Sequence, residues 1–191
     1  DPSPVVSDAA GPVLGDLAAF AVDFRDQYYG LVGAVSDDVD GPPLVTSGLI
    51  EPGRCLWGER PVRFAKQRYA APRVDLDLLD TRLREWAHRR LVPKILIANQ
   101  TRVIEAVADP EGAWLPGVPV ITCTPRQGER LDERLDERLD EVLGVLSSEA
   151  ATAWVRHHAA GSGLSAGTVR LTPALLASIP LVARPDARPG A

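Results

Sequence analysis

Apolar residues recur at helical spacing in the middle of the chain. In residues 74–93 (VDLDLLDTRLREWAHRRLVP), three leucines and Trp86 fall three or four positions apart. This spacing predicts an amphipathic helix that Asp75 caps and Pro93 limits. The two arginines in its last turn are explained by the helix dipole, so they are not counted as ligand contacts.

A tandem repeat follows in the last third of the chain. The stretch ERLDERLDERLDEVLGVL at 129–146 places its leucines on one stripe, and we expect Leu131, Leu135 and Leu139 to face inward from a peripheral helix. The period of four lasts only three units, which is too short for a coiled coil. A second helix is expected to follow, up to about His158.

Strand-like runs occupy much of the remainder. Residues 28–35, 60–74 and 94–99 alternate or cluster apolar residues in the manner of strands. RVIEAVA and GVPVITCT are predicted to pair with each other around 109–112, where Asp, Pro and Gly take turn-favouring positions. Neighbouring strands after a helix favour an antiparallel or mixed sheet over a repeated βαβ pattern.

These elements predict one α+β domain with a mixed or antiparallel sheet and flanking amphipathic helices. We expect this domain to span 14–182. The segments 1–13 and 183–191 are rich in Pro, Ala and Gly, and we expect them to be flexible.

Composition places the chain among globular proteins. Its 191 residues are 45% hydrophobic and 25% charged, with no membrane-length apolar run and no signal-peptide pattern. Two distant cysteines favour a reducing, cytoplasmic setting. There is no methionine, and all basic residues except Lys66 and Lys94 are Arg. We therefore expect an excised part of a longer protein from a GC-rich bacterial genome.

Charge is unevenly distributed. Residues 1–53 carry one Arg against nine acidic residues, residues 54–102 carry twelve Lys or Arg against five, and residues 103–191 carry eight Arg against twelve. A central basic block in a chain of net charge −5 is typical of a localised polyanion-binding face. An Arg-rich surface balanced by neighbouring acids explains the same counts, and charge alone does not separate the two interpretations.

No catalytic or metal-binding motif stands out. GSGLSAG at 161–167 follows a predicted helix, whereas a dinucleotide loop must follow a strand. The pair His157 and His158 points in two directions on a helix and has no Cys-x-x-Cys partner, so no metal site is predicted.

Side chains that donate hydrogen bonds lie on either side of the helix predicted for residues 74–93. Arg pairs with guanine, Asn or Gln with adenine, and Lys or Thr with phosphate oxygens. Each residue alone is equally explained as a loop or strand end, but their clustering predicts a DNA-binding face. The candidates are Arg60, Arg63, Lys66, Arg68, Arg73, Lys94, Asn99, Gln100, Thr101 and Arg102.

The order of segments resembles a known family. FRDQYYGLVGAV, PLVTSGLIEPGRCLWGERPVRFAKQRYAAPRVDL and LVPKILIANQTRVIEAVADPEGAWLPGVPVITC resemble the C-terminal target-recognition region of bacterial DNA adenine-N6 methyltransferases. More distantly, they resemble the recognition domains of type I restriction specificity subunits. The tail AGSGLSAGTVRLTPALLASIPL resembles the way such domains close. The likeness covers about 14–182.

The resemblance implies sequence-specific recognition of double-stranded DNA within a restriction-modification type of enzyme. The family's S-adenosylmethionine loop and Asn-Pro-Pro-Tyr/Phe motif are absent from this chain, so no catalytic residue and no cofactor is assigned to it. The methyltransferase domain and its S-adenosylmethionine are expected N-terminal to this segment in the parent protein. The alternative is a repurposed protein-interaction module that docks a partner through its acidic segments and does not bind DNA.

Overall fold

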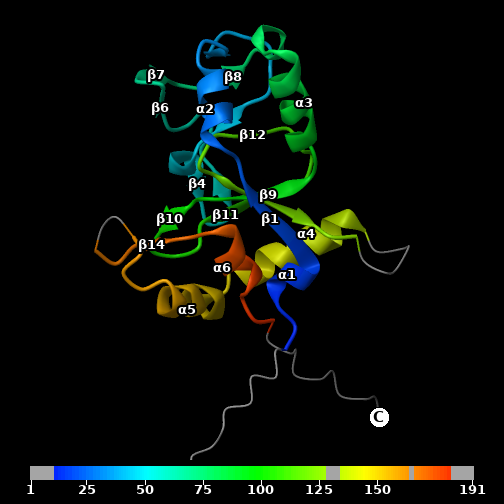
Figure 1. Ribbon diagram of the computed structural model, residues 1–191, viewed down its shortest axis with the longest axis vertical. Helices are drawn as coiled ribbons and strands as arrows, with labels where there is room; N and C mark the ends of the chain where they lie inside the picture. Colours follow the sequence, from blue (N-terminus) through cyan, green and yellow to red (C-terminus); the bar gives the residue numbers. More distant parts are fainter. Residues whose placement is uncertain (1–10, 128–133, 164–165, 182–191) are drawn as a thin grey trace, which may run out of the picture.

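A four-stranded antiparallel sheet forms the centre of the protein. The computed structural model describes residues 11–127, 134–163 and 166–181. The sheet runs in the order β1-β13-β9-β11, and Figure 1 labels β1, β9 and β11 near the middle of the molecule. Its strands are β1 (Ala18–Val22), β13 (Ile121–Pro125), β9 (Lys94–Ile97) and β11 (Ala106–Asp109). All four residues of β9 are buried, as expected of a central strand covered on both faces.

The expected pairing of the two strands around 109–112 is wrong. Gly112 donates its backbone N–H to Asp109 O at 3.2 Å, so the predicted turn forms. The chain does not fold straight back, however, because β12 (Leu115–Pro116) first pairs in parallel with β3 (Leu44–Val45). Both β11 and β13 then pair with β9, which lies between them.

Helices cover one face of the sheet. They are α1 (Leu14–Leu17), α4 (Leu135–Leu146), α5 (Glu149–His158) and α6 (Pro173–Ala177). Leu139, Val142 and Leu146 of α4 are fully buried in the same core as the sheet, so this helix is not peripheral. Leu135 begins the helix and is 46% exposed, which contradicts its expected inward orientation. Leu131 lies outside the described residues.

The other face of the sheet is covered by a layer of short elements, which continues into the part drawn uppermost in Figure 1. A separate apolar cluster fills that upper part between α2, α3 and β12. The remaining elements are α2 (Arg25–Leu31), β2 (Val35–Ser36), η1 (Ser47–Leu49), β4 (Ile50–Glu51), β5 (Arg54–Cys55), β6 (Val62–Phe64), β7 (Gln67–Tyr69), β8 (Arg73–Val74), η2 (Leu76–Leu78), α3 (Thr81–Arg90), β10 (Gln100–Thr101) and β14 (Val169–Arg170).

Two predicted elements differ in this upper part. The expected helix of 74–93 is divided into η2 and α3, because Asp75 caps the first and Asp80 caps the second through the Leu83 N–H. The stretch 28–35, expected as a strand, begins within helix α2. Tyr28 and Leu31 are three residues apart, and both pack into the upper cluster, which a helix allows and a strand does not.

The architecture confirms a single-domain α+β fold with antiparallel sheets and flanking helices. The expected flexible ends fall largely on 1–10 and 182–191, which lie outside the described residues. Within the described part, none of the helices is long and apolar enough to cross a membrane.

Candidate nucleic-acid interface

The β6–β7 hairpin has a two-residue turn. Phe64 lies opposite Gln67, which leaves Ala65 and Lys66 as the connecting residues. Their φ angles are 48° and 68°, the left-handed values that a type I′ turn requires at both positions. Asn-Gly is the usual sequence for this turn, so two residues with ordinary side chains are held here in a conformation that costs free energy.

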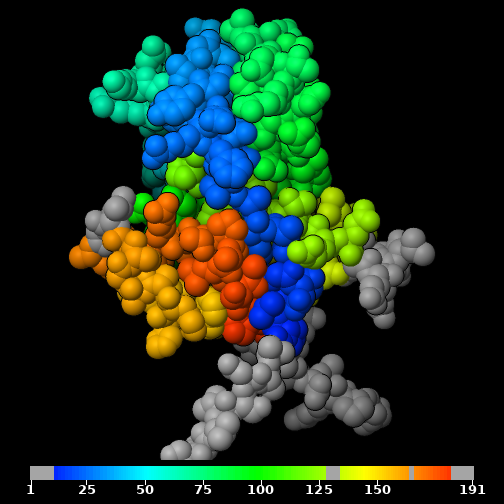
Figure 2. Space-filling view, in the orientation of Figure 1, coloured from blue at the N-terminus to red at the C-terminus, as the bar shows by residue number. Residues whose placement is uncertain are grey.

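Packing on one side of the hairpin holds it in place. Val62 and Phe64 are buried, whereas Arg63 between them is exposed. The Phe64 ring lies 4.9 Å from the Tyr28 ring, and the Tyr28 hydroxyl accepts a 3.2 Å hydrogen bond from the Ala65 N–H. The buried face therefore anchors the hairpin to α2 and leaves the other face in solvent. Figure 2 shows the hairpin projecting from the upper part of the molecule.

The exposed face of the hairpin carries three cations. Arg63 and Arg68 are direct cross-strand partners, and Lys66 occupies the turn between them. All three are exposed, and none forms an ion pair or side-chain hydrogen bond with the residues that the structure describes. Like charges placed directly opposite each other destabilise a strand pair. An anion bound between the hairpin cations (Arg63, Lys66 and Arg68) would relieve that repulsion.

Two further predicted contacts, Arg60 and Arg73, are held by the protein itself. Arg60 forms an ion pair with Glu51 at 2.7 Å and donates to Gly48 O at 3.0 Å. Arg73 donates to Gly41 O at 2.7 Å, and its guanidinium lies 4.6 Å from the centre of the Trp57 ring. Arg73 therefore has a structural role, while Arg60 remains exposed beside the hairpin.

The predicted DNA contact of Lys94 is wrong. Its side chain is completely buried, and Nζ lies 2.6 Å from Asp109 Oδ2. Burial lowers the Lys94 pKa, and the hydrogen bond from Lys94 to Asp109 opposes that shift. The cross-strand register places Lys94 opposite Asp109, so the positive charge is neutralised inside the protein. Lys94 was predicted at an interface because basic residues lie near it in the sequence. The register between the strands instead places it beside a buried carboxylate.

The polar cluster after β9 is used mainly for local structure. The Asn99 side chain accepts from Ser47 Oγ at 3.4 Å, and Gln100 pairs with Arg170 in the β10–β14 ladder. Thr101 is buried, and its hydroxyl donates to Val103 O, so it is not available to DNA. Arg102 alone in this cluster is exposed. Figure 1 places β10 and β14 well below the β6–β7 hairpin, so the two groups of donors are separate.

The basic segment 54–102 therefore does not form one continuous positive surface. Five of its twelve cations are neutralised by carboxylates in the pairs Arg54–Glu59, Arg60–Glu51, Arg82–Asp26, Arg90–Asp23 and Lys94–Asp109. Arg84 donates to three backbone carbonyls near η2. What the structure retains from the predicted face is a compact cationic hairpin.

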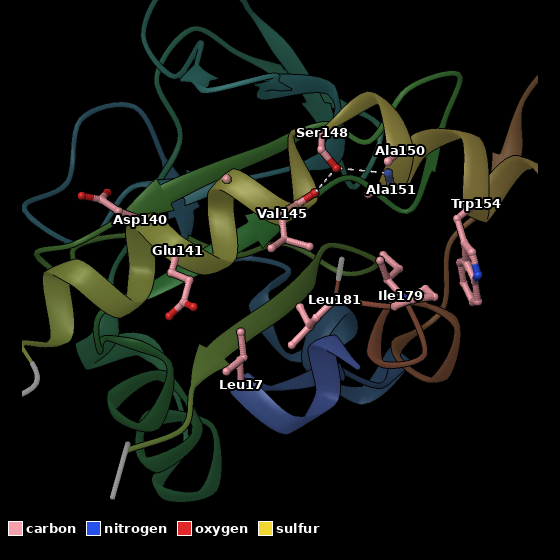
Figure 3. A pocket seen from close by; sticks show the side chains of 12 residues that line it. Leu17, Asp140, Glu141, Val145, Ser148, Ala150, Ala151, Trp154, Ile179 and Leu181 are labelled. Atoms are coloured by element: carbon pink, nitrogen blue, oxygen red, sulfur yellow. Dashed lines mark hydrogen bonds between the residues drawn. The ribbon is translucent and has the colours of Figure 1, made fainter. Parts of the chain in front are cut away.

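A cavity lies at the end of the molecule opposite the β6–β7 hairpin. It has a volume of about 800 Å³ and is lined by residues of α4, α5, α1 and the segment at Ile179–Leu181. Figure 3 shows Val145 facing Leu181 across it, with Glu141 towards one end and Trp154 at the other. Apolar walls and an acidic rim do not suit a polyanion, so we do not include this cleft in the nucleic-acid interface.

Neither cysteine has the chemistry of a nucleophile. Burial raises the pKa of Cys123 to about 12, and burial also raises the pKa of Cys55. Both thiols are therefore protonated near neutral pH. The reactive form of cysteine is the thiolate, so neither side chain is an activated nucleophile. The described residues contain no group of three or more His, Cys, Asp or Glu side chains placed to hold a metal ion.

Comparison with known proteins identifies no matching protein family and no curated protein with a significant match. The hairpin and its surroundings are therefore the basis for assigning a function.

Proposed function

We propose that this chain is the sequence-specific DNA-recognition module of a bacterial, cytoplasmic adenine-N6 methyltransferase. The observation that carries this proposal is the β6–β7 hairpin, whose three exposed cations have no charged partner among the residues that the structure describes. The resemblance of the sequence to target-recognition regions supplies the enzyme class. Double-stranded DNA is the ligand, and a methyltransferase domain preceding this segment in the parent protein is the partner.

The hairpin has the dimensions for entering DNA. The major groove admits a two-stranded β-ribbon, and Arg is the side chain that pairs bidentately with guanine or a phosphate. Arg63 and Arg68 lie side by side on the outer face, while Lys66 extends from the turn. In our proposal Arg68 contacts a base edge, while Arg63 and Lys66 contact phosphate oxygens. The net charge of −5 keeps the rest of the molecule away from the duplex.

The chemical step belongs to the preceding domain. That domain would bind S-adenosylmethionine, extrude the target adenine from the stack and transfer the methyl group to N6. The residues of this chain would set which sequence is presented.

A binding experiment with matched charge changes tests the proposal. The readout is fluorescence anisotropy of a labelled 30-base-pair duplex of mixed sequence at two salt concentrations, with the full chain. We expect Lys66→Gln to weaken binding and to reduce the salt slope by about one unit, as for one phosphate contact. Arg89→Gln is the control, because Arg89 is an exposed cation with no ion pair to any described residue, and it belongs to α3, which lies across the upper part from the hairpin in Figure 1. Equal affinity for the Lys66 and Arg89 variants would contradict the proposal.

The large cleft beside α4 favours a second candidate, a protein-interaction module. Its apolar walls would take an apolar segment, and Asp140 and Glu141 would attract a basic residue. Binding of a protein there would be insensitive to the hairpin variants. A Gly144→Leu substitution adds bulk to the wall of this cleft, which Gly144 lines and where a Cβ at Gly144 meets no atom within 4 Å. Intact DNA binding in Gly144→Leu together with loss in Lys66→Gln would favour the DNA-recognition role.

A further inference from the structure

A second, smaller pocket lies at the foot of the cationic hairpin. It has a volume of about 410 Å³, within the range of small-ligand sites. Its lining comes from parts of the chain that are far apart in sequence: α2, the β3–η1 segment, residues 60–64 and the loop at Val118–Pro119. It is therefore a product of the tertiary fold and not of one flexible loop.

Two guanidinium groups give the pocket a net positive charge. Arg60 is fixed at its edge by Glu51 and by the Gly48 carbonyl. Arg63 also lines the pocket and has no partner among the described residues. Glu51 compensates only one of the two arginines, so one positive charge remains to bind an anion. Arg is the side chain best suited to a phosphate.

The rest of the lining suits a flat ring. Tyr28 and Phe64 contribute aromatic surface, and Pro61 and Pro119 contribute rigid apolar surface. Thr46 is among the few hydrogen-bonding side chains of the lining. Stacking surfaces with a few polar groups and a cation are the means by which proteins hold an unstacked base and its phosphate.

We propose that this pocket binds a single nucleotide, with the ring against Tyr28 and the prolines and the phosphate at Arg63 and Arg60. The inference rests on the proposed DNA-recognition role only for the source of the nucleotide. A base within a duplex is stacked and cannot enter, so the ligand is either an unpaired nucleotide of a strand held by the hairpin or a free nucleotide.

The test uses a substitution that adds bulk at the pocket wall. Gly48 lines the pocket, and a Cβ at this position meets no atom within 4 Å, so Gly48→Leu adds a side chain at the pocket wall without a clash at its Cβ. Thr46→Val is the second variant, because it removes one hydroxyl and keeps the shape. Gly144→Leu is the matched control, since its Cβ is equally unobstructed and it lies in the distant cleft.

Four kinds of probe are titrated into the full chain and followed by NMR chemical-shift changes and calorimetry. They are the four deoxynucleoside monophosphates, inorganic phosphate, a fully paired duplex, and the same duplex with one unpaired nucleotide. If the ligand is a free nucleotide, we expect the monophosphates to bind at least about tenfold more tightly than phosphate. If it is an unpaired nucleotide of a strand, we expect the duplex with the unpaired nucleotide to bind at least about tenfold more tightly than the paired duplex. We expect Gly48→Leu to remove that preference, and Gly144→Leu to retain it. A smaller loss is expected for Thr46→Val.

The outcomes separate this inference from the proposed function. Preference for monophosphates identifies a free nucleotide as the source, and preference for the unpaired site identifies the strand. Equal binding of phosphate and monophosphates, with no preference for the unpaired site, overturns the inference even if the paired duplex binds. Monophosphate binding without any duplex binding retains the pocket and refutes the DNA-recognition role.

Discussion

At the scale of single residues, the buried pair of Lys94 and Asp109 is not symmetric. Lys94 Nζ has Asp109 as its charged partner and a longer contact of 3.3 Å to Val92 O. Asp109 also accepts 3.0 Å hydrogen bonds from the backbone N–H groups of Ala113 and Trp114. Removing the acid therefore isolates a buried cation and frees two backbone donors, whereas removing the lysine leaves the carboxylate with two donors.

We accordingly predict that Asp109→Ala destabilises the protein by about 3–5 kcal/mol, the cost of leaving a buried charge unpaired. Lys94→Met should cost clearly less. Urea unfolding of both variants followed by circular dichroism measures the difference. Equal losses of unfolding free energy would show that the backbone donors do not stabilise the Asp109 carboxylate.

The pH dependence of stability follows from the same pair. Burial lowers the Lys94 pKa in the folded protein below its ordinary value of 10.5. Between the two values the unfolded chain binds more protons than the folded one, so the free energy of unfolding rises with pH in that window. We expect this rise in the wild type and its loss in Lys94→Met, measured by urea unfolding at several pH values above 7. Parallel curves for the two proteins would contradict it.

Sequence alone predicted part of this pair. The turn at 109–112 was identified from its residue types, and it forms. The partner of Asp109 was not identifiable, because a cross-strand neighbour depends on the register between β9 and β11. A lysine beside a basic segment was therefore assigned to the surface, and its charge is in fact buried.

At the scale of elements, the hairpin turn stores strain at its two connecting residues. Ala65→Asn keeps the left-handed conformation, which Asn tolerates better than Ala, and does not change the charge. We expect the free energy of unfolding to rise by roughly 0.5–1 kcal/mol, with DNA affinity unchanged. Thermal unfolding and the anisotropy assay together measure this. A loss of affinity in the stabilised variant would indicate that binding needs the turn to change shape.

Elements with local signals were predictable, and those that depend on distant contacts were not. The helix expected to follow the ERLD repeat up to about His158 forms as α5, because its cap at Ser148 depends only on neighbouring residues. The order of the central sheet depends on which strands meet after long connections, so β9 was not expected between β11 and β13. The sequence predicts a strand over residues 60–74 and not a hairpin, because the turn between β6 and β7 lacks the usual Asn or Gly.

At the scale of the whole molecule, helix α4 ties the repeat to the core. The three ERLD units are identical, so deletion of any one yields the same sequence and retains a leucine two positions before Glu141. Deletion therefore shortens the segment before the buried part of α4 and leaves the positions of Leu139, Val142 and Leu146 occupied.

We predict that deleting one unit costs less than about 1 kcal/mol, whereas Leu139→Ala costs about 2–5 kcal/mol for the cavity it leaves. DNA affinity should be unchanged in the deletion, because α4 lies on the far side of the sheet from the hairpin (Figure 1). Denaturant unfolding and the anisotropy assay test both statements. A deletion as costly as the point substitution would mean that the removed unit itself makes essential contacts.

The two ends of the described chain lie side by side. Leu181 donates its backbone N–H to Pro12 O at 2.9 Å, and Val13 forms an antiparallel bridge with Pro180. A domain whose entry and exit points coincide can be carried in a loop of a host protein without moving the host's own flanks. Such a unit is exchangeable as a cassette. Under the proposed recognition role, replacing one copy by another with a different hairpin would redirect the host to a new target while its remaining parts stay in place.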